Sequence, residues 1–337
     1  MMGAACATLA LRPAPAEWPA YGRNASAAAP ALSSWGGAPL LVDGAWHLYV
    51  SEITGNCSLA DWAVNSRCVH AVAAGVAGPF AFSDEAVGVF CHNAAPVADP
   101  ATGTLWLFHI GQGTAGAPAK NCSAAAAGAA AGAAADVGSV LHYASSPYGP
   151  WLPATNVTGL PKCNNPAPAL LRNGTWAILC HEARGSALLL RAPHPTGPWA
   201  AFGAEIDMGA HTEDPFLYED GLGNLHALFH AFTTDPSPAP PQSCAGALVS
   251  AHAFSGDGGL SWARSDTPPF GNEVALSGGG GPLVVATRER PKLVLDAART
   301  PIALFTGASA VQTCPPASCC GCKYDGWSFT LAQETEV

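Results

Sequence analysis

Two adjacent acids, Glu213 and Asp214, stand directly before Pro215 at the start of an apolar segment. Apart from these acids, residues 211–232 have the composition of a β-hairpin, with apolar strands on either side of a turn at 220–224. Neighbouring carboxyl groups can act as general acids and bases when a fold brings them to a shared site. We therefore look for the same arrangement elsewhere in the chain, because a repeat would indicate which elements position the acids.

Five copies of the hairpin arrangement, including this one, occur along the chain. Each copy has a short polar lead, a proline, an apolar strand, a turn, and a second strand rich in aromatic and aliphatic residues. Aligned on the proline, the copies begin near residues 36, 93, 165, 213 and 289. The anchoring prolines are 57, 72, 47 and 76 residues apart, with insertions in the wider gaps: Pro39, Pro96, Pro168, Pro215 and Pro291.

A second element follows each of the first four copies. A predicted third strand runs into a Gly-Pro or Gly-rich turn and ends on an aromatic residue, which is Phe80, Trp151, Trp199 or Trp262. Four short strands in each unit, at a period of about 40 to 50 residues, are typical of propeller blades. The sequence therefore predicts an all-β, five-bladed β-propeller. The alternative is a β-sandwich with chance prolines, which does not explain why both elements repeat in the same order.

The repeats also predict the domain organisation. Residues 1–30 are expected to form an N-terminal extension and residues 31–337 a single propeller domain. The alanine-rich and glycine-rich stretch 123–138 is expected to be a flexible insertion, and the proline-rich stretch 235–243 a loop.

In a propeller the innermost strand of each blade lines a central channel, so the polar strand starts converge on one spot. Acids, amides, a histidine and an arginine together suit a ligand rich in hydroxyl groups. Two carboxyl groups from different blades would also provide the acid and base for hydrolysis of a glycosidic bond. The converging set is Gly36, Gly37, His92, Asn93, Asn164, Asn165, Glu213, Asp214, Glu289 and Arg290.

Structural roles are open for several of these polar residues. Glu289 and Arg290 could form an ion pair at the rim, and Asn93 and Asn165 could cap turns. Acids within turns are expected to be structural, as are histidines that recur at one place in the third strand. These residues are Asp43, Asp220, Asp257, His70, His142 and His252.

Composition narrows the class of protein. The net charge is −10 with only 14 Lys and Arg residues, which argues against binding to nucleic-acid backbones. No run of about 18 apolar residues is present, so no membrane span is expected. We expect a monomer that needs no metal and no cofactor.

Cysteines and glycosylation motifs indicate the compartment. Four of the twelve cysteines crowd into CPPASCCGC (314–322) with no second knuckle to complete a zinc site, so disulfides are favoured. Five N-x-S/T motifs occur, at Asn24, Asn56, Asn121, Asn156 and Asn173. Both features predict a secreted protein or one in the endomembrane lumen, although the first 19 residues make a poor signal peptide.

Four motifs carry a resemblance to a known group of proteins. EDP (213–215), NPAP (165–168), HN-x-x-P (92–96) and ERPKLVLD (289–296) resemble the strand starts of the five-bladed propeller glycoside hydrolases, around families 43, 62 and 117. The stretch 51–71 is similar to one branch of that superfamily. The resemblance covers nearly the whole chain and implies the same fold and an activity on carbohydrate.

Family 43 implies a general base on the first blade, an aspartate that tunes pKa, and a glutamate acid. Asp214 matches the tuning aspartate. Glu289 resembles the later-blade acid, and Glu213 competes for that role. Where the family places its base, this chain has Gly36, Gly37 and Ala38.

Two residues could compensate for the missing base. Glu52 is the nearest acid on the following strand. The resemblance to family 117 implies a histidine as the acid, which makes His92 a candidate.

The sequence thus predicts a glycoside hydrolase that acts on an oligosaccharide or polysaccharide. The predicted catalytic residues are Asp214, Glu289, Glu52 and His92. The predicted substrate-binding residues are Asn93, Asn165, Glu213, Arg290 and Trp35. The main alternative is a non-catalytic glycan-binding propeller that has lost its base. A sialidase, suggested by the Asp box at 255–262, is a weaker alternative because such enzymes usually gather three arginines.

Overall fold

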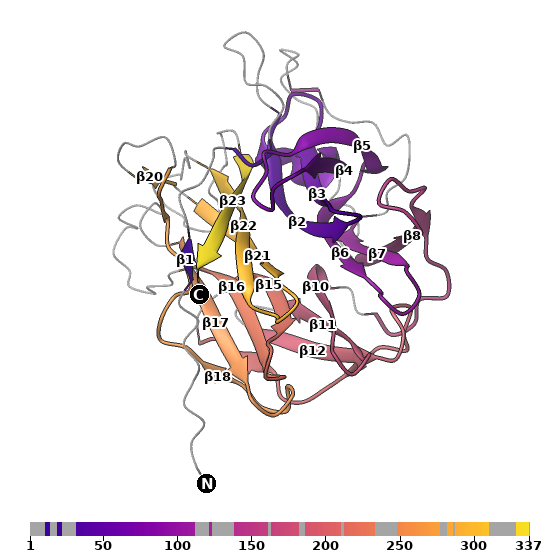
Figure 1. Ribbon diagram of the computed structural model, residues 1–337, viewed down its shortest axis with the longest axis vertical. Helices are drawn as coiled ribbons and strands as arrows, with labels where there is room; N and C mark the ends of the chain where they lie inside the picture. The colour runs from indigo at the N-terminus through magenta and orange to yellow at the C-terminus, as the bar shows by residue number, and fades with distance from the viewer. Residues whose placement is uncertain are drawn as a thin grey trace.

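The computed structural model is an all-β propeller whose five blades surround a central axis (Figure 1). It describes residues 11–13, 19–21, 32–111, 121–122, 138–160, 163–181, 186–209, 212–232, 248–276, 282–285, 287–309 and 328–336. The stretches 123–137 and 235–243 and the cysteine cluster at 314–322 lie outside these residues. The predicted fold class is confirmed.

Each blade is an antiparallel sheet whose first strand lies nearest the axis (Figure 1). The first blade contains β2 (Ser34–Val42), β3 (Ala45–Ile53), β4 (Ser66–Ala73) and β5 (Ala81–Val87). The second contains β6 (His92–Ala98), β7 (Leu105–Ile110), β8 (Ser139–Ala144) and β9 (Leu152–Pro153). The third contains β10 (Asn164–Leu170), β11 (Trp176–His181), β12 (Ser186–Ala192), β13 (Ala200–Ala201) and β14 (Ile206–Asp207). The fourth contains β15 (Thr212–Glu219), β16 (Leu225–Phe232), β17 (Leu248–Ser255) and β18 (Ala263–Arg264).

The fifth blade joins both ends of the described chain. Its strands are β21 (Thr287–Leu295), β22 (Pro301–Ser309), β23 (Ser328–Glu336) and β1 (Arg12–Pro13). β1 pairs with β23 as the outer strand, with Arg12 opposite Glu336. Nearby, Tyr21 is buried and bridges Phe80 and Thr330. Residues 12–13 and 20–21, which precede the expected boundary at residue 30, therefore pair through their backbone groups with strands of the propeller.

The remaining elements are short. A hairpin of β19 (Glu273–Val274) and β20 (Leu283–Val284) precedes the fifth blade. One helical turn follows β3, formed by η1 (Leu59–Asp61) and α1 (Trp62–Asn65). Among the described residues, no helix is long and apolar enough to cross a membrane.

Gly37 in the first blade has a φ of 109°, and apart from it every inner strand departs from regular extended structure at one residue near its start. At that residue φ lies between 54° and 64°, in the left-handed region, and the pairing register shifts immediately after it. A β-bulge of this kind bends the strand and redirects a side chain. The five residues, which we call the axial ring, are Gly36, Asn93, Asn165, Asp214 and Arg290.

The axial ring corrects the alignment of the repeats by two residues. Pro215 and Pro291 come directly after the left-handed residue, as Pro166 does, whereas Pro39 and Pro96 come three residues after it. The anchoring prolines are therefore not equivalent in all five blades. A sequence alignment on proline cannot show this, because a bulge shifts the register without leaving a gap.

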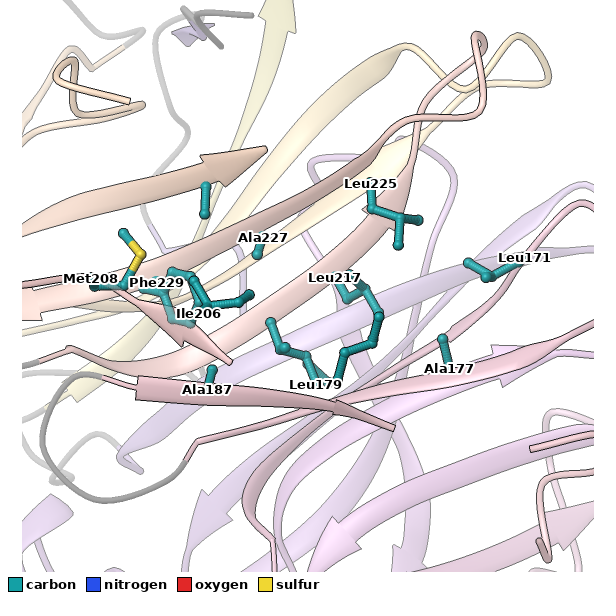
Figure 2. Packing of buried hydrophobic residues seen from close by; sticks show 13 residues of the cluster. Leu171, Ala177, Leu179, Ala187, Ile206, Met208, Leu217, Leu225, Ala227 and Phe229 are labelled. Carbon is teal, nitrogen blue, oxygen red and sulfur yellow. The ribbon is translucent and has the colours of Figure 1, made fainter. Parts of the chain in front are cut away.

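Apolar contacts between neighbouring blades form the core. The largest cluster joins the third and fourth blades, where Leu179 of β11 and Leu217 of β15 lie together (Figure 2). Phe229 and Ile206 extend it outward, and all four side chains are at most 1 % exposed. Close packing of this kind fixes the angle between adjacent blades, and with it the position of the inner strands.

Buried histidine pairs join the second and third strands of three blades. The ring nitrogens of His47 and His70 lie 2.8 Å apart, those of His109 and His142 2.8 Å, and those of His226 and His252 3.0 Å. These contacts confirm the expected packing role of the third-strand histidines. Burial lowers the pKa of five of the six, namely His47, His109, His142, His226 and His252.

The acids expected in turns are structural. Asp257 accepts hydrogen bonds from the Ser255 hydroxyl (2.8 Å) and the Ser261 backbone (2.9 Å), as an Asp-box turn requires. Asp220 accepts from the backbone of Leu222 (2.9 Å) in the β15–β16 hairpin. Asp43 takes a left-handed conformation in the turn after β2.

Three disulfides are formed by the six described cysteines. Cys57 is bonded to Cys122, Cys68 to Cys91, and Cys163 to Cys180. The second of these links β4 to the residue before β6, so it joins the first two blades. Disulfides, expected from the sequence, are thus confirmed for the described cysteines.

We expect the free energy of unfolding to decrease as the pH falls below about 6.5. Burial lowers the pKa of His109 and His252 from 6.5 to about 3, so the unfolded chain binds more protons in this window. Each such group removes about 1.4 kcal/mol of stability per pH unit. Glu213 acts in the opposite sense, because its pKa is raised from 4.5 to about 7 and its contribution is lost as the pH rises. Two histidines outweigh one glutamate, so the net change follows the histidines.

Thermal denaturation between pH 7.5 and 4.5 (about three pH units) measures this dependence. His252→Gln should weaken it, whereas the same change at the exposed His194 should leave it as in the wild type. An equal slope in both variants would contradict the assignment.

Candidate active site

The axial ring forms a hydrogen-bonded polar cluster across the centre of the propeller. The Asn93 amide donates to Oδ1 of Asn165, and the Asn165 amide donates to Oδ1 of Asp214 at 2.7 Å. Nη1 of Arg290 donates to Oδ1 of Asn165 at 2.9 Å and lies 3.1 Å from Oδ1 of Asp214. Four blades therefore contribute one polar side chain each, as the convergence of strand starts predicts.

This geometry decides between the alternatives left by the sequence. Asn93 and Asn165 are engaged with each other across blades, so their side chains do not act as local turn caps. Arg290 forms its ion pair with Asp214, which comes from the neighbouring blade.

The ring has unused hydrogen-bonding capacity. Oδ1 of Asn93, Oδ2 of Asp214 and Nε of Arg290 are buried and have no hydrogen-bond partner within the part of the chain described. Buried polar atoms usually have partners, and exceptions often mark ligand sites. Residues of the ring also line a small pocket, together with Gly37, Ala94, Pro166 and Lys292.

Glycine on the first blade makes room for the arginine of the fifth. A Cβ added to Gly36 would lie 3.2 Å from Cδ of Arg290, which is closer than most such contacts. The Arg290 side chain thus occupies the space that a larger residue on the first blade would need. This is also the blade on which the resemblance to family 43 places a base.

Glu213 and Glu289 lie one residue before the ring, next to His230 on β16. Ligand atoms of Glu213, Asp214 and His230 all lie within 4.8 Å of one another. Nε2 of His230 is 4.0 Å from Oε1 of Glu289. The same Glu289 oxygen accepts a hydrogen bond from the Thr287 hydroxyl. The structure therefore brings both glutamates to one cluster beside the axis.

The pKa of Glu213 is raised to about 7. Burial is the main cause, and the negative charges of Asp214 and Glu289 add to it, while Arg290 acts in the opposite direction. A carboxyl group with this pKa is still about half protonated at neutral pH and can donate its proton.

Lys292 lies two residues beyond Arg290 and lines the pocket. Its Nζ donates to the backbone oxygen of Pro215 at 3.1 Å and lies 5.4 Å from the ring of Phe216. Burial lowers the pKa of this lysine to about 8, Asp214 opposes that shift, and Arg290 adds to it.

His92 is a buried neutral histidine at the edge of the site. Its Nδ1 is 2.7 Å from the Ser66 hydroxyl, and its ring stacks on Trp62 with centroids 5.0 Å apart. Burial lowers its pKa well below 6.5, and the charge of Arg290 adds to the effect. Its Nε2 is buried with no hydrogen-bond partner among the described residues.

Two predicted residues are not brought to the pocket. Glu52 is fully buried, accepts a hydrogen bond from the Tyr21 hydroxyl at 2.8 Å, and pairs with Arg67. Trp35 is 1 % exposed and packs over Gly307, where an added Cβ would lie 2.6 Å from the indole. The structure thus engages both side chains inside the first and fifth blades.

The site contains residues that the sequence did not single out. His230 and Lys292 lie within strands, at positions that read as ordinary alternation, and Trp62 lies in the loop after β3. For His230, the sequence would have indicated the site only with the correct pairing register, which places His230 opposite Glu213.

A metal ion fits this site poorly. Glu213, Asp214 and His230 are suitable ligand types, and their ligand atoms are close together. However, Arg290 lies 3.1 Å from Asp214, and Lys292 lines the same pocket. These two positively charged side chains oppose the binding of a metal cation.

Comparison with solved structures identifies the class of fold. The catalytic domain of a GH62 α-L-arabinofuranosidase from Coprinopsis cinerea matches with a TM-score of 0.59 and 13% identity, over 95% of this chain and 96% of that one. A family 117 glycoside hydrolase from Zobellia galactanivorans matches with a TM-score of 0.59 and 12% identity, over 97% and 90%. A GH43 β-xylosidase/α-arabinofuranosidase from a compost metagenome matches with a TM-score of 0.56 and 11% identity, over 96% and 94%.

These matches confirm, at the level of the fold, the resemblance to the five-bladed propeller glycoside hydrolases. No family model matches the sequence, and no curated protein matches it. The low identity means that the roles of individual residues rest on the geometry of this site.

Gly36→Ala should destabilise the protein more than Gly44→Ala. Both glycines have positive φ, so both substitutions carry a backbone cost of about 1 kcal/mol. Only at Gly36 does the new methyl group meet another side chain, that of Arg290, since nothing lies within 4 Å at Gly44. Chemical denaturation of both variants measures the difference, and equal losses would show that Arg290 does not depend on this space.

Proposed function

We propose that the protein is a glycoside hydrolase that cleaves an oligosaccharide or polysaccharide at the axial ring. The proposal is carried by Glu213 and Asp214, two adjacent carboxyl groups at the start of β15 that lie in different environments. Glu213 has a pKa raised to about 7, whereas the adjacent Asp214 accepts a hydrogen bond from Asn165 and pairs with Arg290. Carboxyl groups in environments this different can divide the acid and base roles.

We assign the general acid to Glu213, which would protonate the leaving oxygen. Glu289 is the candidate base, because it lies in the same cluster and its negative charge helps to keep the proton on Glu213. This differs from the sequence-based assignment, in which Asp214 and Glu289 were the carboxylates and Glu213 bound substrate. Asp214 is better suited to holding a hydroxyl group, since its Oδ2 is available and its Oδ1 is engaged.

The amides and the arginine would orient the sugar. Asn93 offers an acceptor oxygen and Arg290 offers its Nε, both buried at the pocket. His92 could contribute through its Nε2. Similar solved structures include an arabinofuranosidase and a β-xylosidase/α-arabinofuranosidase, which makes plant-type glycans the first substrates to test.

We further propose that the protein is secreted or resides in the endomembrane lumen. The three disulfides support an oxidising compartment. Four of the glycosylation motifs have an exposed asparagine, at Asn56, Asn121, Asn156 and Asn173.

A glycan-binding protein without catalysis is the second candidate. Gly36 leaves the first blade without a carboxyl group at the ring, and the Arg290 side chain takes up the adjoining space. Such a site could hold a sugar through Asn93, Asn165 and Asp214 and never cleave it.

Glu213→Gln should lower kcat/KM by roughly 100-fold or more on any glycoside that the wild type cleaves, because the acid is lost. In the wild type, kcat/KM should fall as the pH rises through about 7, where Glu213 loses its proton. A panel of nitrophenyl arabinofuranosides, xylosides and galactosides, followed by the matching oligosaccharides, provides the assay.

Glu205→Gln is the matched control, since Glu205 is exposed on the outside of the third blade. It should keep wild-type turnover. Binding of oligosaccharides without release of reducing ends at any pH would favour the glycan-binding alternative and contradict hydrolysis.

A further inference from the structure

A partly exposed tryptophan, Trp62, stacks on His92 next to the axial ring. Trp62 begins α1 in the loop between β3 and β4. Because β2 and β3 are antiparallel, the end of β3 lies beside the start of β2, and Glu52 is opposite Ser34. The loop therefore rises from the same face of the propeller as the axial ring.

Contacts place Trp62 one residue away from the ring. Its indole stacks on His92, with centroids 5.0 Å apart and planes inclined by 29°. His92 directly precedes Asn93, which lines the pocket, and the charge of Arg290 acts on His92. His92 itself is fully buried, whereas Trp62, which stacks on it, remains partly exposed.

The loop holds the indole in a fixed place. The Asn65 side chain donates to the Thr54 backbone oxygen at 2.8 Å, and the Thr54 backbone donates to the Asn65 oxygen at 2.9 Å, which closes the base of the loop. Cys57 is bonded to Cys122, and Leu59 is buried beside it. A pre-organised side chain loses little conformational freedom when a ligand binds.

An aromatic ring of this kind is suited to a sugar. Sugar rings have one face of C–H groups, and an indole combines a large apolar surface with a polar edge. The ring residues offer hydroxyl-binding groups, whereas Trp62 offers a flat apolar surface next to them. The aromatic residue expected at the substrate from the sequence, Trp35, is buried beneath this loop in the same apolar cluster.

We propose that Trp62 forms a second sugar subsite, where it stacks against the C–H face of the unit next to the one held by the axial ring. The inference rests on the proposed carbohydrate function and specifies it. The ligand is an oligosaccharide of at least two units, and a single sugar does not use the whole site.

The test measures the gain in affinity with ligand length. Dissociation constants are determined by calorimetry for the mono-, di- and trisaccharides of the arabinan, xylan and galactan series. Glu213→Gln is used as the background, so that cleavage does not interfere. The parent should bind the disaccharide of at least one series more tightly than its monosaccharide, and Trp62→Ala should remove about tenfold of that gain.

Two further variants keep the result interpretable. Trp62→Phe retains an aromatic face and should keep most of the gain, even if Trp62→Ala loosens the loop. Tyr148→Ala is the matched control: Tyr148 also packs on a buried histidine, His70, but lies in the loop after β8, on the opposite face. It should bind all ligands as the parent does.

The outcomes separate this inference from the proposed function. Undiminished gain in Trp62→Ala overturns the subsite and leaves hydrolysis untouched. Loss of the gain in a protein that never releases reducing ends supports the subsite and overturns hydrolysis. Failure of the parent to bind any of these sugars overturns both.

Discussion

Each inner strand has one residue in the left-handed conformation, and the site depends on that bulge. In a regular strand, successive side chains alternate between the two faces of a blade. The bulge breaks this alternation at Asn93, Asn165, Asp214 and Arg290 and brings four polar side chains from different blades into contact. Apolar packing between blades then fixes the strands in which the bulges occur. The polar centre and the hydrophobic core are therefore parts of one arrangement.

Charge is distributed so that neighbouring acids behave differently. Asp214 is balanced by Arg290, a contact that Gly36 permits by having no side chain. Glu213 is partly buried beside two negative charges, and both its burial and these charges raise its pKa to about 7. A group like Glu213 suits the donation of a proton near neutral pH. A charge-balanced carboxylate like Asp214 suits hydrogen bonding to hydroxyl groups.

The repeat, the fold and the convergence of strand starts could be predicted from the sequence because proline, turn and apolar strand recur in a fixed order. Which residues are equivalent from blade to blade could not be predicted. Pro215 and Pro291 come directly after the left-handed residue of the bulge, whereas Pro39 and Pro96 come three residues after it. Contacts between residues distant in the sequence also determine the positions of two predicted site residues, and the sequence does not show these contacts. Glu52 is held by Arg67 and Tyr21, and Trp35 lies over Gly307 of the fifth blade. The sequence did not indicate His230 or Trp62, because each reaches the site through a residue distant in the sequence. His230 is opposite Glu213 in the β15–β16 pair, and Trp62 stacks on His92.

The pairing of β1 with β23 has a bearing on how the molecule is made. Arg12 and Glu336 are 324 residues apart in the sequence (336 − 12), yet the two are partners in one sheet. The circle of blades cannot close until both of these strands have been synthesised, and such distant pairing slows folding. Until then the apolar flank of the first blade that packs against the fifth, which includes Leu48 and Val50, is uncovered.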